Sequence, residues 1–201
     1  MCFLSDSFLC DIRRSEIRRD KMKSRRTRQR VSFLVVMAIY AVCSVSALAA
    51  QESIVGFWKQ VDEKSGKPDS LVYIYQYQGK FFGRLIASYK TDGTIGDTIL
   101  TKQDKADKLL GDPPFCGLDF VYNLEPKGKE YRGGIIDPRD AKEYDCRVWR
   151  DGNNLIVRGQ LKGLGFLGRN QTWIVSSIEE LPAGFSMPDP KTFVPPIQKK
   201  K

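Results

Sequence analysis

Histidine is absent from all 201 residues of this chain. Without an imidazole, the protein cannot use Ser/His/Asp or Cys/His nucleophilic pairs, a histidine general base or a histidine-ligated zinc site. Any catalysis would depend on carboxylates, lysine, tyrosine or cysteine. We therefore predict no catalytic residue, no metal and no cofactor; a carboxylate-based enzyme, with two acids converging in one cleft, is the least favoured hypothesis.

Most of the chain also lacks an excess of positive charge, although its net charge is +9. The first 49 residues carry 10 Lys and Arg against 4 Asp and Glu, and the other 152 carry 23 against 20. A nucleic-acid site needs clustered basic residues. The one basic run of the body is the terminal tripeptide 199–201, so we expect no nucleic-acid partner.

The basic residues of the leader precede an apolar run, and this order is typical of an export signal. Five Lys and Arg lie between residues 23 and 30, and the apolar segment 31–50 contains Ala-Leu-Ala at 47–49. A positive block, an apolar core and an A-x-A site form a secretory signal peptide. We predict cleavage after Ala49 and a periplasmic protein; an uncleaved membrane anchor is the alternative. Residues 1–21 precede a second Met and have the character of an over-extended start.

Cysteine is scarce once the leader is removed. Of five cysteines, only Cys116 and Cys146 follow residue 49. In an oxidising compartment two cysteines form a disulfide candidate. Two separate buried thiols are the alternative.

The body has no alternation of strands with helices, which excludes a parallel α/β sheet. Short runs rich in β-branched and aromatic residues predict about eight strands, separated by turns such as Gln78-Gly79 and Asp151-Gly152-Asn153. The runs are 54–61, 71–77, 80–89, 118–124, 130–136, 142–150, 155–161 and 169–176. Because closing a meander removes its exposed edges, we predict an all-β, antiparallel up-and-down barrel. A two-sheet sandwich is the alternative.

These runs divide the chain into three parts. Residues 1–49 are the signal peptide and 50–180 the single barrel domain, in which 90–117 is a long connection with a short helix at 102–110. Residues 181–201 hold five prolines and three terminal lysines, so they predict an extended tail.

Aromatic residues at alternate positions are the first candidates for a ligand site. Tyr73, Tyr75 and Tyr77 share one face of their strand. Inside a barrel they would supply apolar walls with hydroxyl groups, and outside they would form a cross-strand ladder. Both placements are open at this stage. Trp173 is a further candidate, and Arg158 could bind a ligand carboxylate or pair with a strand carboxylate such as Asp145.

The triplet Gly56-Phe57-Trp58 resembles the Gly-x-Trp signature of lipocalins. The resemblance implies that Trp58 plugs the closed end of a barrel and that an arginine of the last strand packs on its ring. Arg169 is the expected partner.

The segment 163–168 matches G-x-G-x-x-G, but a strand-like sequence follows it. A dinucleotide site needs a helix there, so we interpret the segment as an apolar loop. We expect Leu164, Phe166 and Leu167 to cover the barrel mouth or to contact the envelope.

Six short motifs together resemble a family of small exported bacterial proteins called domain of unknown function 2147. They are IVGFW at 54–58, CGL at 116–118, GIIDP at 134–138, YDC at 144–146, LIVRG at 155–159 and LGRNQTW at 167–173. Ala141 and Gln160 depart from the family pattern, which would have glycine and an aromatic residue there. The resemblance implies a periplasmic, lipocalin-like barrel and no particular reaction.

Two functional hypotheses remain. The first is a non-enzymatic periplasmic barrel that binds a small, largely apolar ligand such as a fatty acid or lipid. The second is an envelope structural or interaction protein whose barrel is filled by its own side chains. An internal cavity above about 300 Å³ favours the first.

Overall fold

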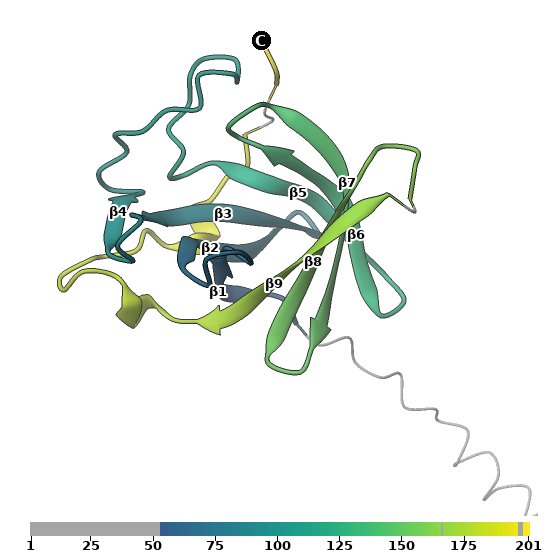
Figure 1. Cartoon of the computed structure of the whole chain (residues 1–201), viewed down its shortest axis with the longest axis horizontal. Helices are drawn as coiled ribbons and strands as arrows, with labels where there is room; N and C mark the ends of the chain where they lie inside the picture. Colours follow the sequence, from purple (N-terminus) through teal and green to yellow (C-terminus); the bar gives the residue numbers. More distant parts are fainter. Residues whose placement is uncertain (1–52, 166, 197–198) are drawn as a thin grey trace, which may run out of the picture. The chain divides into compact units, whose positions relative to one another are not determined.

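Strands form half of the described chain, which comprises residues 53–165, 167–196 and 199–201 of the computed structural model (Figure 1). The described residues belong to the unit that runs from Gln51 to Lys201. The strands are β1 (Gly56–Val61), β2 (Pro68–Tyr77), β3 (Lys80–Tyr89), β4 (Ile95–Thr98), β5 (Asp119–Lys127), β6 (Glu130–Asp137), β7 (Lys142–Asp151), β8 (Asn154–Gln160) and β9 (Gly168–Ser176). No helix of this part is long and apolar enough to cross a membrane. The predicted signal peptide and its cleavage site lie outside the described residues.

Eight of these strands close into an antiparallel barrel. Each pairs with its neighbours in the order β1-β2-β3-β5-β6-β7-β8-β9, and β1 pairs again with β9. The short β4 joins the end of β3 outside this ring, through Ala87↔Thr98 and Tyr89↔Ile95. The prediction of an eight-stranded up-and-down barrel is confirmed, and the sandwich alternative is excluded because the ring has no break.

The two ends of the barrel differ in the length of their connections. Tight turns join β2 to β3, β5 to β6 and β7 to β8 at one end, which we call the closed end. The other end, the mouth, carries the longer loops 62–67, 138–141 and 161–167 and the connection between β4 and β5. This asymmetry follows from the up-and-down topology, in which successive connections alternate between the two ends.

Large apolar side chains fill the interior near the closed end. Trp58, Leu124, Val148, Leu155 and Trp173 are all at most 2% exposed and belong to one core cluster. Burying such side chains supplies the main free energy of folding. The half of the barrel next to the closed end is therefore a packed core.

The long connection contains β4 and no helix, so the helix predicted at 102–110 is wrong. The buried carboxylate of Asp97 explains why. It accepts hydrogen bonds from the backbone N–H groups of Gln103 (2.7 Å) and Asp104 (3.2 Å). Ala106 N–H donates to the Pro113 carbonyl at 2.9 Å. These hydrogen bonds use backbone N–H groups that a helix would direct to its own carbonyls, and they hold the segment in turns.

The tail after β9 is extended as predicted, and it packs along the barrel. It contains two 3-10 turns, Ile178–Glu180 and Pro190–Thr192. Phe193 is buried against the outer face, and Lys200 forms a bridge with Leu109 of the long connection. In Figure 1 the yellow tail accordingly ends beside that connection.

Candidate functional site

A cavity of about 880 Å³ occupies the half of the barrel next to the mouth. Its wall combines apolar side chains from several strands and from the long connection, chiefly Leu85, Phe115, Phe120, Ile135 and Val157. Gly159 also lines it, and a Cβ added there would meet nothing closer than 3.9 Å. The interior of the barrel is therefore packed at one end and hollow at the other.

The inward residues of β9 become more polar toward the mouth. Trp173 is buried beneath the cavity, with its ring 6.0 Å from that of Phe120, a lining residue. Gln171 lies one inward position nearer the mouth, and Arg169 one further, opposite Gly159 of β8. The alternation of side chains along a strand produces this order.

An amide band crosses the wall at the level of Gln171. Ser70 Oγ donates to Gln60 Oε1 at 3.0 Å, and Gln60 Nε2 donates to Gln171 Oε1 at 3.4 Å. Trp173 Nε1 donates to the same oxygen at 3.3 Å. The band connects β2, β1 and β9, and it separates the apolar depth from the charged mouth.

Charged side chains of both signs surround the mouth. Arg139 Nε lies 3.1 Å from Asp137 Oδ1, and this hydrogen bond raises the pKa of Arg139. Arg169 makes no ion pair with a described residue. Asp69 lies on β2 at a bulge, opposite the point between Gln60 and Val61 of β1 where the pairing shifts register. Its side chain lines the cavity. The mouth can thus bind an anionic group through Arg169 and, in part, Arg139.

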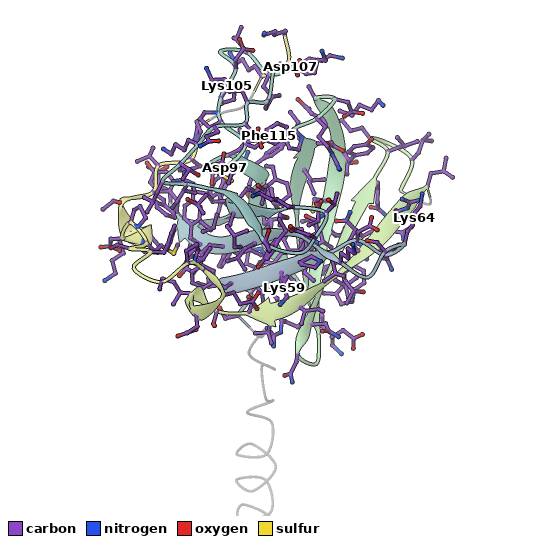
Figure 2. The ribbon with its side chains drawn as sticks, turned by 60° about the vertical axis from the view of Figure 1, so that its left-hand side comes forward. Lys59, Lys64, Asp97, Lys105, Asp107 and Phe115 are labelled. Atoms are coloured by element: carbon purple, nitrogen blue, oxygen red, sulfur yellow. The ribbon has the colours of Figure 1, made fainter. Side chains whose placement is uncertain are left out.

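The long connection supplies the remaining side of the cavity. Phe115, Asp104 and Lys105 line it. Figure 2 shows Lys105 and Asp107 on a loop that extends away from the strands, with Phe115 nearer to the strands. No described residues form a group of three Asp, Glu or Cys that could hold a metal ion.

Trp58 lies in the core of the closed end. It is 2% exposed, and its Nε1 donates to the Ile54 carbonyl at 2.8 Å. Arg150 packs on its ring, with the guanidinium carbon 4.8 Å from the ring centroid. The expectation that Arg169 packs there is wrong, because Arg169 begins β9 at the mouth whereas Trp58 pairs with Val175 near the end of that strand. Arg150 lies just before the β7–β8 turn at the closed end. Its position directly before the turn residues Asp-Gly could have indicated that it lies at the same end of the barrel as Trp58.

Tyr73, Tyr75 and Tyr77 face outward and not into the cavity. The Tyr75 ring lies 5.9 Å from Phe82 of β3 and 5.2 Å from Phe193 of the tail. Of the two placements left open by the sequence, the outer aromatic ladder is the one observed. A strand face cannot be assigned from alternation alone when both faces are buried, and here the tail buries the outer one.

Arg158 also lies away from the cavity, on the outer face of β8, where its Nη1 donates to Asn170 Oδ1 at 2.8 Å. None of the five predicted ligand residues, Trp58, Tyr73, Tyr75, Arg158 and Trp173, lines the cavity directly. Trp58 and Trp173 lie together in the core beneath it. Gln60, Gln171 and Arg139 line the cavity although the sequence pattern did not single them out. The inward register of Gln60 and Gln171 on their strands could have identified these two, whereas Arg139 lies in the β6–β7 loop, where strand alternation gives no direction.

Cys116 and Cys146 are free thiols, so the candidate disulfide is not formed. Cys146 lies on β7, while Cys116 ends the long connection just before β5. Burial raises the pKa of each thiol to about 12. The alternative of two separate buried thiols is the one observed.

The loop 161–167 lies at the mouth. Leu161 and Leu167 line the cavity and are 45% and 46% exposed, and Leu164 is 44% exposed without lining it. Phe166 lies outside the described residues. Placement at the mouth agrees with the expected loop position, and contact with the envelope stays a prediction.

A closed, antiparallel eight-stranded barrel with one open end is the architecture of lipocalins. This chain is similar to HP1028 of Helicobacter pylori, whose solved structure is described as belonging to the lipocalin family. The two share 24% sequence identity with a TM-score of 0.51, over 64% of this chain and 86% of that one. The likeness shows the fold.

The chain itself belongs to the family described as uncharacterized protein conserved in bacteria (DUF2147). The family model matches residues 56–175, which include β1 to β9 almost completely. No curated protein matches the chain.

The two departures from the family pattern lie beside the mouth. Ala141, in the β6–β7 turn, has a φ of +56°, a conformation in which glycine is less strained. Gln160 is 5% exposed, and its Nε2 donates to the Gly165 carbonyl. Gln160 thus fastens the loop 161–167 to β8.

Proposed function

We propose that this protein is a periplasmic, non-enzymatic barrel that binds a small, largely apolar ligand, fatty-acid-like or lipid-like, in the mouth cavity. The cavity of about 880 Å³ is the observation that carries the proposal. Small-molecule sites have volumes of roughly 300–1,000 Å³, with mostly apolar walls and a few placed polar groups. A barrel filled by its own side chains accounts for the closed end and leaves the hollow half without a role.

The distribution of polarity supports an elongated ligand with one polar end. Its apolar part would lie against Phe120, Leu85 and Val157. These three side chains line the cavity and are at most 8% exposed. Its polar end would lie at Arg169, whose guanidinium has five N–H donors and no described carboxylate to pair with. Arg169 therefore takes the role that the sequence led us to expect of Arg158.

The periplasmic location is supported by the leader. If the signal peptide is cleaved as proposed, protein recovered from the periplasmic fraction of a bacterium that expresses the whole chain will begin at Ala50. Intact-mass measurement and N-terminal sequencing check this. Full-length protein retained in the membrane or cytoplasmic fraction would contradict it.

Filling the cavity should abolish ligand binding without unfolding the barrel. In Gly159→Phe, a ring enters space in which a Cβ meets only Ile135 and Tyr144, each at 3.9 Å. We expect affinity for a fatty acid such as myristate to fall at least about tenfold, because the ring occupies the volume of the ligand chain. Isothermal titration calorimetry measures the affinity.

Ile156→Phe is the matched control, because Ile156 lies on the other face of β8 and does not line the cavity. It should bind myristate as the natural protein does. Equal binding by Gly159→Phe would place the ligand elsewhere and overturn the proposed site. Failure of the natural protein to bind any long-chain amphiphile would overturn the proposed function.

A further inference from the structure

A second, smaller cavity of about 200 Å³ adjoins the first at the mouth. Both cavities are lined by Gln60, Asp69, Arg139, Arg169 and Gln171. The smaller one extends beyond these residues under the β1–β2 loop. The two spaces therefore form one path, with the two arginines at their junction.

The smaller cavity, which we call the outer cavity, has more acidic than basic side chains beyond the junction. Asp62, Glu63 and Lys64 line it in addition to the shared residues. Asp62 Oδ1 accepts from the Ser65 N–H and the Ser65 hydroxyl, each at 2.8 Å, and these bonds lower the pKa of Asp62. Asp62 is therefore ionised at neutral pH. Figure 2 shows Lys64 on this loop.

Two carboxylates of this path are exposed, Glu63 in the outer cavity and Asp69 at the junction. Neither Glu63 nor Asp69 makes an ion pair with a described residue. Arg139 is paired with Asp137, and it also attracts Asp69 more weakly, without forming an ion pair. The outer cavity thus offers acidic groups to a ligand, next to a junction that offers guanidinium groups.

A free fatty acid matches only part of this path. Its carboxylate would lie at the junction, and nothing of it would reach the acidic outer cavity. A head group that continues past its anionic group to a cationic one matches both regions, because each charge meets the opposite sign.

We propose that the ligand is a single-chain amphiphile with a zwitterionic head. Its anionic group lies between Arg139 and Arg169, and its cationic group lies among Asp62, Glu63 and Asp69. This inference rests on the proposed function, since the chain of the same ligand occupies the larger cavity.

Three probes with the same 14-carbon chain test the proposal: lysophosphatidylethanolamine, lysophosphatidylglycerol and myristate. Each is titrated below its micelle concentration into the chain that begins at Ala50. We expect the zwitterionic probe to bind at least about fivefold more tightly than either anionic probe, as expected for one additional partly exposed charge pair.

Two variants separate the contributions of the charges. Arg169→Gln should weaken all three probes by about fivefold, because all carry the anionic group. Glu63→Gln combined with Asp69→Asn should weaken only the zwitterionic probe, again by about fivefold. Asp107→Asn, an exposed change on the long connection outside both cavities, is the control and should change nothing.

The outcomes are distinct. Equal affinity for the three probes, or a double variant that leaves the preference intact, overturns the zwitterionic head and leaves the binding barrel standing. No binding of any probe overturns both. Glu63→Gln alone, at an exposed loop position, gives the same test if the double variant is unstable.

Discussion

Trp58→Ala is expected to lower the free energy of unfolding by about 3–5 kcal/mol, in the range of large-to-small changes at buried aromatic residues. The ring is 2% exposed, its Nε1 donates to the Ile54 carbonyl, and Arg150 packs on its face. The substitution leaves a void at the closed end, an unsatisfied carbonyl and an arginine without its aromatic partner. Urea unfolding followed by circular dichroism measures the change.

Trp149→Ala is the matched control. Trp149 is the neighbour of Arg150 on β7 and is only partly buried. Its loss should cost clearly less than the loss of Trp58. Similar costs for the two variants would contradict the role of Trp58 as the plug of the closed end.

Asp119→Ala is expected to cost a comparable 3–5 kcal/mol or so, the usual effect of removing one member of a buried ion pair. The Asp119 side chain is fully buried, and Arg84 binds it through Nε at 3.0 Å and Nη2 at 2.5 Å. The Tyr75 hydroxyl donates to the same carboxylate at 2.9 Å. The variant leaves the Arg84 guanidinium, which is 12% exposed, without its counter-ion.

This change should also loosen the C-terminal tail. The Arg84 guanidinium carbon lies 4.1 Å from the Phe193 ring centroid, and Nη2 donates to the Val194 carbonyl at 3.3 Å. We expect limited proteolysis to cut the tail of Asp119→Ala faster than that of the natural protein, under conditions in which both barrels are folded.

Arg84→Met combined with Asp119→Leu provides the control for the charge. Because this pair replaces both ions with apolar groups, it should recover much of the stability lost by Asp119→Ala. If the double variant is no more stable than the single one, the loss comes from packing and not from the unpaired arginine. Unchanged stability of Asp119→Ala would contradict the prediction outright.

The strands were predictable because their signals are local. The aromatic residues and flanking turn residues of segments such as 80–89 and 142–150 identified β3 and β7 almost to their ends. The short β4 was missed because Ile-Gly-Asp-Thr has no strand composition and pairs at only two positions. The absence of helix at 102–110 depends on the buried Asp97, which binds the backbone of that segment from outside it.

The candidate site was less predictable. Tryptophan and tyrosine drew attention by residue type, yet Trp58 and Trp173 plug the barrel and the tyrosines face the tail. The cavity instead uses Gln60, Gln171 and Arg169, common residue types whose importance comes from an inward register at the mouth.

The amino-acid order alone established an all-β chain with closely spaced strands, because periodicity and turn residues act over a few neighbours. Which side chains share the interior, where that interior is empty, and which arginine meets Trp58 depended on how β1 closes on β9 and on the tail covering β2 and β3. Those contacts join residues a hundred or more positions apart, and no short-range pattern encodes them.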